Sequence, residues 1–471
     1  MASLSSLLKD IADAIRNKKG TTNLINPQDF ASEIAGIEGG GEDVVPIISW
    51  TGHADEEGLK AIGWTDEDIA YFQEYGVNWN EEDDELHKVS DANKAVYYVL
   101  TDKNISTYKA HIVYLPKINT SIRTSFANYF SNLYWLEGVP SLDTSKATTV
   151  SGMFSGCSSL LAVPPLNISN VTTTKSMFSG CRMLRYIPNL DTSKSKDMAS
   201  MFQNCSSLRE VPMMDTQNVT TMASMFNGCY LLREVPAFNT QNVTTMASML
   251  YNCRTLNTIP HFDTSKVTTM GSMFYGCYNL VKVPPLDTSL VTTFTSMFYA
   301  CSSLIDVPQM DVSSATTMEA MFSGCNNIMN IPNLGASNAT NVKNMFNACY
   351  ALSSAPLVNT SSATNVDAMF STASALVTIP EVDMQSVTSI STSPFNKCYA
   401  LKDVRVKNMK VSTSFANCYF LNKESLLYMI NNEASESAIT ITLNATAYTD
   451  LAEDEDVLAA LASHPNISLA K

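Results

Sequence analysis

The chain has 471 residues but little charge, and it lacks the residue arrangements on which most catalysis and metal binding depend. Charged residues make up 16% of it, and its five histidines, at positions 53, 87, 111, 261 and 464, are too scattered to predict a catalytic triad or a ligand cluster. It has no CxxC pair of the kind that structural zinc sites use, and no phosphate-binding loop. We therefore expect no enzymatic activity, no metal and no cofactor.

Long apolar runs are also missing. Lys9, Asp10 and Asp13 interrupt the apolar positions of the first 20 residues, so these residues do not make the apolar region of a secretory signal. The starting Met1 argues against a signal that has already been removed. No later stretch is long and apolar enough to span a membrane. The sequence thus predicts a protein that is not inserted in a membrane and that is assembled in the cytoplasm where it is made.

Basic charge is scarce in the middle of the chain. Residues 119–418 contain 18 Lys or Arg against 16 Asp or Glu, whereas residues 1–118 contain 10 against 21 and residues 419–471 contain 2 against 8. The excess of acid behind the net charge of −15 therefore lies in the two ends. A nearly neutral middle without a basic stripe does not favour binding to nucleic acid, which depends on neutralising phosphates.

What the middle does contain is a repeat of 24 residues. Nine of the 11 cysteines each follow the last by 24 residues: Cys157, Cys181, Cys205, Cys229, Cys253, Cys277, Cys301, Cys325 and Cys349. Three residues before the cysteine position the same register holds Phe130, Phe154, Phe178, Phe202, Phe226, Leu250, Phe274, Phe298, Phe322, Phe346 and Phe370. The register loosens afterwards, at Cys398 and Cys418. A period of this length, sustained over so many units, predicts a solenoid.

Each unit is predicted to form a short helix or 3₁₀ turn followed by a short strand. We number positions from the phenylalanine, so that Met222, Met225 and Cys229 lie at −4, −1 and +3 of the unit of Phe226. Spacings of three and four bring these side chains to one face of a helical turn. A proline at +10, such as Pro236, ends the turn and biases the residue before it toward an extended conformation. Asp or Asn at +13, followed by Thr or Ser, caps the next turn.

Stacking explains why the chain repeats itself. One unit is too small to bury its apolar side chains alone, whereas stacked coils, rising about 4.8 Å each, share a continuous core of Met-Phe, Cys and Leu ladders. A cysteine ladder invites a metal or disulfide interpretation, but Leu133 and Ala373 fill the same position without a polar replacement. We therefore predict that the cysteines are buried, reduced thiols that act as small apolar residues.

The repeat pattern VTTMxSMFxGCxxLxxVPxLDTS resembles the BspA-type leucine-rich repeats of bacterial surface proteins and phage tail proteins. The resemblance covers roughly 300 residues and implies binding at a surface, but no particular ligand. The segment IADAIRNKKGTTNLINPQDFASEIAGI resembles the N-terminal segments of tail and fibre proteins from tailed phages. The GLKAIGW segment is similar to modules of gut-phage virion proteins, and the C-terminal end resembles the caps of repeat-bearing phage tail proteins.

The fold class expected is α+β: a right-handed-type, leucine-rich-repeat-like solenoid of 24-residue coils, with small N-terminal modules and a C-terminal cap. Residues 1–38 are expected to form a helical attachment or oligomerisation segment, or else a helical hairpin docked on its own chain. Residues 42–118 are expected to form an acidic α+β module with two short helices and with AVYYVL and AHIVYLP as strands. The solenoid spans 119–418. In the α/β cap, 419–471, KESLLYMINN and DEDVLAALASH are predicted helices, and AITITLNATAYTDL and NISLA predicted strands.

The aspartates at +13 are candidates for catalytic residues, because glycan-cleaving enzymes use paired carboxyls. They are Asp143, Asp191, Asp215, Asp263, Asp287, Asp311 and Asp383. Retaining glycosidases need two carboxyls about 5 Å apart, but stacking alone produces that separation, so the distance is not diagnostic. Asn239 and Asn359 fill the same position, which favours turn formation over acid chemistry.

The candidate binding residues are aromatic. Tyr251, Tyr275 and Tyr299 lie at +1 in three consecutive coils, and Tyr230, Arg254 and Tyr278 lie at +4. In register they form a compact patch of rings and one guanidinium. Tyr and Arg are favoured at recognition sites, and sugar rings stack on aromatic faces. The alternative is a tyrosine ladder that only covers neighbouring coils.

These features together predict a non-enzymatic virion protein of a tailed phage, in the tail or a fibre, whose solenoid binds a host-surface receptor. The expected partners are other virion proteins, through the N-terminal segment, and a host cell-surface glycan or protein. A homo-oligomer is also expected. The alternatives are a secreted, BspA-like adhesin on a bacterial surface, a purely architectural virion component and a glycan depolymerase.

Overall fold

The computed structural model describes residues 47–49, 87–90, 96–100, 120, 123–139, 141–335 and 338–471. The chain divides into two compact units, one of Met1–Thr120 with Leu133–Leu142 and the other of Ser121–Asn132 with Asp143–Lys471. The domain boundaries expected from the sequence stay predictions.

The first unit contains a small mixed sheet. Its strands are β1 (Ile47–Ser49), β2 (His87–Ser90) and β3 (Val96–Leu100), in the order β1-β3-β2. Strand β3 pairs parallel with β1 and antiparallel with β2. This confirms AVYYVL as a strand. The helices predicted in residues 1–38 and 42–118, and the strand AHIVYLP, lie outside the described residues.

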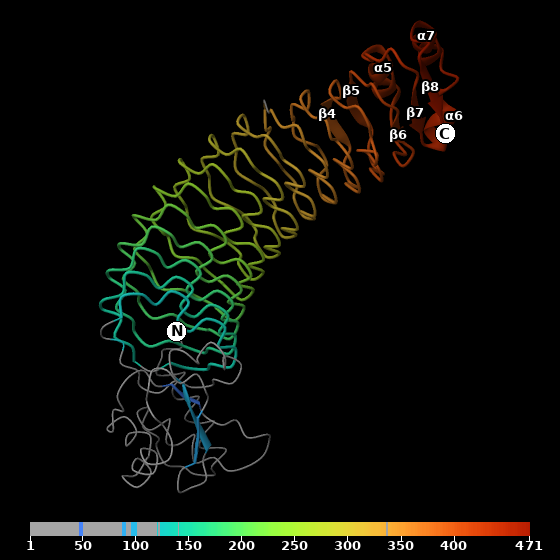
Figure 1. The fold of residues 1–471 in the computed structure, drawn as a ribbon. Coiled ribbons are helices and arrows are strands. Elements are labelled where there is room, and N and C mark those ends of the chain that lie inside the picture. Colours follow the sequence, from blue (N-terminus) through green and yellow to red (C-terminus); the bar gives the residue numbers. More distant parts are fainter. Residues whose placement is uncertain are drawn as a thin grey trace. The chain divides into compact units, whose positions relative to one another are not determined.

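The second unit is a stack of coils, which follow one another in sequence order from cyan to orange in Figure 1. Residues 24 apart lie on one another, as the parallel bridges from Thr221 to Thr245 and from Thr245 to Thr269 show. The phenylalanine ladder is equally regular: the rings of Phe154 and Phe178 are stacked at 5.7 Å between centroids and 7° between planes. The repeat solenoid expected from the 24-residue period is therefore confirmed.

Within a coil the residues around the phenylalanine form consecutive turns, and not a helix. The amides of Met225 and Cys229 donate to the carbonyls three residues back at 3.1 and 3.0 Å, while the amides of Phe226 and Gly228 donate to the next coil at 2.9 and 2.8 Å. Ser224 and Gly228 have φ angles of 56° and 78°, and such left-handed residues interrupt a right-handed helix. The prediction of a short helix is therefore wrong. The alternative prediction, a 3₁₀ turn, is closer, because these hydrogen bonds join residues three apart.

The predicted strand position holds a second backbone ladder. At +7 the amide of Arg233 donates to the carbonyl of Arg209 at 3.0 Å, and the amide of Met329 donates to that of Ile305 at 2.9 Å. Proline at +10 has no amide to continue such pairing, so the described coils before residue 378 hold bridges but no named strand. The strand prediction therefore holds only for the last coils, where β4 (Thr378–Asp383) pairs parallel with β5 (Asp403–Lys407).

The C-terminal residues close the stack with regular structure. The elements are β6 (Thr413–Phe415), α5 (Lys423–Asn431), β7 (Ile439–Leu443), α6 (Ala445–Leu451), α7 (Glu455–Ser463) and β8 (Ile467–Ala470), and the parallel sheet order is β6-β7-β8. Both predicted helices and the strand NISLA are confirmed. The strand predicted for AITITLNATAYTDL is wrong after Leu443, because the Asn444 side chain accepts from the Thr446 amide and caps α6.

A threonine at +14 adds a polar ladder inside the coils. The Thr264 hydroxyl, 2% exposed, donates to the Asp287 carbonyl of the next coil at 2.8 Å, and Thr216 and Thr240 do the same. A buried hydroxyl with a partner stabilises the stack, whereas one without would cost free energy. The threonine of the Asp-Thr-Ser segment, predicted only as part of a cap, therefore also makes a hydrogen bond between coils.

The core is the set of ladders itself. The side chains of the Phe, Met, Cys and Leu positions along the array are almost all fully buried. Burying one Phe, Met or Leu side chain contributes about 1.5–3 kcal/mol, so each added coil stabilises its neighbours substantially. In the part of the chain that the structure describes, no helix is long and apolar enough to cross a membrane.

Candidate functional site

The +1 tyrosines form one continuous stack. The ring centroids of Tyr251 and Tyr275 are 4.4 Å apart and those of Tyr275 and Tyr299 are 4.5 Å apart, with planes within 10°. The backbone fixes this register, because the Tyr251 and Tyr275 carbonyls accept from amides of the preceding coil. Burial, helped by the neighbouring phenols, raises the pKa of Tyr275 to about 12.

The +4 residues form a second stack beside the first. The Arg254 guanidinium lies over the Tyr230 ring at 4.5 Å and over the Tyr278 ring at 5.6 Å, so it is held between them. Tyr275 and Tyr278 lie three residues apart in one coil, so the two stacks are neighbours. The structure therefore brings all six predicted site residues together.

The two stacks cover many of the ring faces on which a sugar would stack. Tyr275 has a ring on each side, and Arg254 covers one face each of Tyr230 and Tyr278. This geometry favours the interpretation in which the tyrosine ladder covers neighbouring coils, and it weakens the interpretation in which the patch is a platform for sugar stacking.

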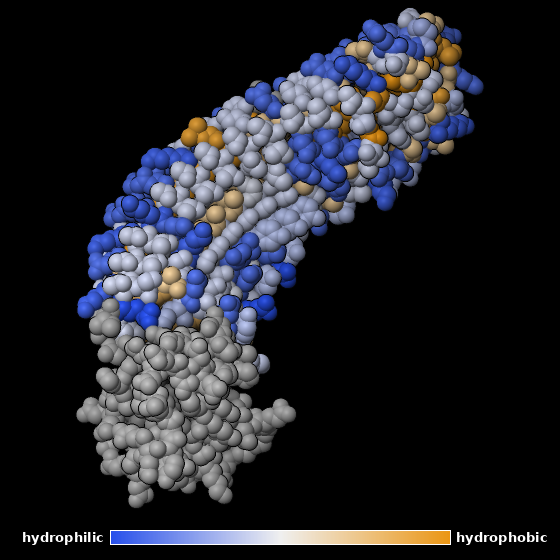
Figure 2. All heavy atoms as spheres, in the orientation of Figure 1, coloured by the Kyte–Doolittle hydropathy of each residue, from blue (hydrophilic) through white to orange (hydrophobic). Residues whose placement is uncertain are grey.

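Another surface stands out by its composition. Most of the large apolar side chains that the second unit exposes lie between +4 and +7: Met183, Tyr230, Leu231, Tyr278, Val281, Ile305, Met329, Tyr350, Val377, Tyr399, Tyr419 and Phe420. We call positions +4 to +7 the binding edge. The array face in Figure 2 is mostly pale or blue, with larger orange areas toward the C-terminal end. Exposed apolar residues that gather in one place mark interaction surfaces.

Basic residues share this edge, which corrects the expectation that the array has no basic stripe. Arg185, Arg209 and Arg233 occupy +7 in three consecutive coils, Arg182 occupies +4 in the first of them, and all four are exposed. The net charge of residues 119–418 did not reveal these arginines, because acidic residues elsewhere in the array balance their positive charge. The 24-residue spacing, applied to arginine as it was to tyrosine, would have found them.

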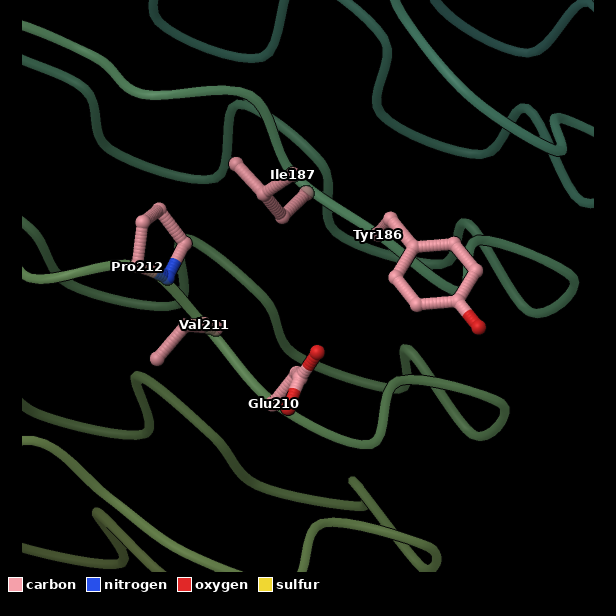
Figure 3. Close-up of a pocket in the computed structure, with 5 residues that line it drawn as sticks. All are labelled: Tyr186, Ile187, Glu210, Val211 and Pro212. Atoms are coloured by element: carbon pink, nitrogen blue, oxygen red, sulfur yellow. The ribbon is translucent and has the colours of Figure 1, made fainter. Parts of the chain in front are cut away.

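A shallow hollow lies next to the arginine positions. Tyr186 and Ile187 of one coil and Glu210, Val211 and Pro212 of the next line a space of about 170 Å³, shown in Figure 3. Drug-sized ligands need about 300 Å³ or more, so this hollow suits one substituent of a larger ligand.

The +13 aspartates serve the turns. Asp263 accepts from the Ser265 hydroxyl at 2.7 Å and from the Ser265 amide at 3.0 Å, and these hydrogen bonds lower the pKa of the Asp263 carboxyl. Asn239 accepts from the Gln241 amide in the same way. A general acid in a glycosidase needs a raised pKa, so the geometry favours turn formation here.

The cysteines are buried as predicted. All 11 are free thiols in the interior, and the Cys229 thiol donates to the Phe202 carbonyl of the preceding coil at 3.1 Å. Burial raises the pKa of Cys229 far above its ordinary range. Among the described residues there is no group of three His, Cys, Asp or Glu that could hold a metal ion.

We compared the chain with curated proteins, with solved structures and with models of protein families. No curated protein matches the chain. A crystal structure of a TLR13–ssRNA13 complex matches with 12% identity and a TM-score of 0.24, and the match covers 80% of this chain and 57% of that one. The plant peptide hormone receptor RGFR1 in complex with RGF2 matches with 10% identity and a TM-score of 0.23, over 74% of this chain and 68% of that one. At this similarity neither carries an argument about what this chain binds.

The family described as "Mycoplasma protein of unknown function, DUF285" matches five times, at residues 120–235, 207–306, 229–330, 278–382 and 306–409. Repeated, overlapping matches are what a leucine-rich-repeat-like array produces. Together they reach from residue 120 to residue 409, more than half of the chain. The chain therefore belongs to the DUF285 family.

Proposed function

We propose that this chain is a non-enzymatic virion protein of a tailed phage, in the tail or a fibre, whose repeat array binds a receptor on the host cell. The observation that carries the binding role is the binding edge, where large side chains gather on an array otherwise exposing mainly Ser, Thr and Asn. The resemblance of the N-terminal segment and of the C-terminal cap to phage tail proteins supports the virion setting.

The edge is ordered before it meets a partner. Val281, Ile305 and Met329 occupy +7 in consecutive coils and are 38%, 42% and 55% exposed. Hydrogen bonds from the amide of one to the carbonyl of the preceding one, at 3.2 and 2.9 Å, join their backbones. The backbone from which these side chains extend is therefore fixed. A surface that is already ordered loses little conformational entropy on binding, and a few large side chains supply most of the binding free energy.

The rest of the proposal concerns assembly. Residues 1–38 attach the protein to other virion proteins and bring copies of the chain together. The coils of the solenoid wind in a right-handed sense. The receptor is a glycan or a protein of the host surface, and the binding edge contacts it.

Attachment to cells tests the binding role. Labelled full-length chain is added to a panel of gut bacterial strains, and bound fluorescence is measured by flow cytometry. Ile305→Asp combined with Met329→Asp should lower attachment to a responsive strain about ten-fold, because charge replaces apolar contact at the edge. The control is Met213→Asp, which is 63% exposed but lies at +11. Unchanged attachment by the double variant would remove the edge as the receptor site.

Imaging of intact particles with this chain located in them tests the setting. Finding the chain at a tail or fibre supports the proposal. Finding it on a bacterial surface without particles would replace the phage setting with that of an adhesin. If the chain is found in the particle but attaches to no strain, the protein would be a purely architectural virion component.

A further inference from the structure

We propose that the four arginines of the binding edge, Arg182, Arg185, Arg209 and Arg233, form a site for a linear acidic polysaccharide. This inference rests on the proposed function and deepens it, because it names the class of receptor that one part of the edge takes. The arginine site is distinct from the aromatic stacks, in which Arg254 is already held between Tyr230 and Tyr278.

The site has the repeat of the solenoid. Arg185, Arg209 and Arg233 lie at the same position of consecutive coils, and the Arg233 amide donates to the Arg209 carbonyl at 3.0 Å. The backbones of Arg209 and Arg233 are therefore about 4.8 Å apart, the spacing of paired strands, and the coil of Arg209 is joined to the preceding coil by the Ser207 amide, which donates to the Arg182 carbonyl at 3.0 Å. Such a row places exposed arginines at regular intervals along the array. It suits a ligand that also repeats its charges along a line.

The four arginines have no acidic partner among the residues that the structure describes. All four side chains are exposed, and within the described ranges none of them forms an ion pair. Like charges held one coil apart repel each other, and a bound anion relieves that repulsion. Guanidinium groups also bind carboxylates through two parallel hydrogen bonds, which gives a planar acidic group a defined orientation.

The neighbouring residues distinguish between kinds of polyanion. Glu210 and Glu234 follow Arg209 and Arg233 at +8, so a row of acceptors runs beside the row of donors. An acidic sugar matches both rows, because its carboxylate accepts from arginine and its hydroxyls donate to glutamate. The hollow between Tyr186 and Glu210 is large enough for a ring substituent.

A nucleic acid fits this site less well. The affinity of a nucleic acid comes chiefly from its phosphates, and a DNA strand has no hydroxyls between them that could donate to Glu210 and Glu234. Single-stranded bases stack on aromatic faces, and both faces of the Tyr275 ring are already covered, by Tyr251 and Tyr299. The observations thus favour a saccharide.

Binding to three defined polymers tests the inference. The full-length chain is titrated calorimetrically with polygalacturonate, which carries carboxylates, with dextran, which is neutral, and with oligo(dT). We expect binding to polygalacturonate that weakens as salt is added, and none to dextran. Arg209→Ala combined with Arg233→Ala should weaken polygalacturonate binding about ten-fold or more, since two charge-assisted contacts are lost.

Matched variants separate charge from geometry. Lys282→Ala removes one exposed positive charge at +8, three coils away from Arg209, and should leave binding unchanged. Arg209→Lys with Arg233→Lys keeps the charge but loses the paired hydrogen bonds, and its affinity should fall between those of the wild type and the alanine variant. Thermal unfolding of each variant checks that the exposed substitutions leave the fold intact.

The outcomes are separable from those of the proposed function. Binding of dextran as tight as that of polygalacturonate, tighter binding of oligo(dT), or unaltered binding by the alanine variant would each overturn the acidic-saccharide site. Absence of polygalacturonate binding in a chain that still attaches to cells would also overturn it and leave the proposed function standing. Binding to polygalacturonate by a chain that attaches to no strain supports the site and overturns the host-attachment role.

Discussion

At the scale of single residues, the ladders place ionisable groups where ionisation is unfavourable. The Cys277 thiol is fully buried and donates to the Leu250 carbonyl at 3.0 Å. Burial raises the pKa of Cys277 from its ordinary 9.0 to about 12, because the thiolate would lose its hydration. The same cause acts on Cys229 and Cys349 in other coils. The thiols therefore remain neutral in the fold at pH values where an unfolded chain would begin to ionise.

A dependence of stability on pH follows. The folded pKa of Cys277 lies above the unfolded one, so its contribution is fully present below pH 9 and is lost as pH rises toward 12. Between pH 9 and pH 12 the free energy of unfolding of the wild type should therefore fall with pH more steeply than that of Cys277→Ala. The difference between the two slopes should be about 1.4 kcal/mol per pH unit. Urea unfolding at several pH values measures that slope. Leu280→Ala, which disturbs packing without removing a proton, should leave it unchanged, and a thiol variant with the wild-type slope would contradict the argument.

At the scale of the element, a coil is defined by its left-handed residues as much as by its apolar ones. Asn204 at +2 has a φ of 60°, and its side chain fills the space where a Cβ on Gly228 of the next coil would lie. Asn132 precedes Gly156, and Asn252 precedes Gly276, in the same way. The sequence period predicted the coil and its apolar positions. It did not reveal that the residues at −2 and +2 have positive φ, because Ser and Asn at those positions are equally typical of ordinary turns.

Gly228→Ala should lower the free energy of unfolding by about 1–3 kcal/mol, since it adds backbone strain and a clash with Asn204. Chemical denaturation measures the loss. Asn204→Gly in the same chain removes the clashing side chain and should recover part of it. Gly271→Ala, where φ is not left-handed and the nearest atom is 3.4 Å away, is the matched control. An equal loss at both glycines, or no recovery in the double variant, would refute the steric explanation.

At the scale of the whole array, the sequence predicts well those features that recur every 24 residues. The Phe, Cys and Tyr ladders were found because each type repeats in register, and the structure stacks them accordingly. The covering of the tyrosine ring faces could not be predicted, because spacing shows which rings are neighbours but not that they stack flat on one another. The unpaired arginines escaped the charge count because a sum over 300 residues hides a local row.

A solenoid held by contacts between neighbouring coils should survive the loss of a whole coil. Deleting residues 218–241 joins Gln217 to Asn242, which repeats the Gln-Asn junctions already present at 217–218 and 241–242. Each ladder then closes on the next member of its own kind, so the shortened chain should keep its circular dichroism per residue and unfold cooperatively. Deleting only residues 218–229 removes half a coil and sets the Met, Phe and Cys positions of one side against polar turn residues of the other. That chain should lose cooperative unfolding, as measured by urea denaturation, because apolar side chains on both sides of the junction lose their partners. If the two deletions proved equally damaging, the stability of the array would have to come from contacts that reach beyond adjacent coils.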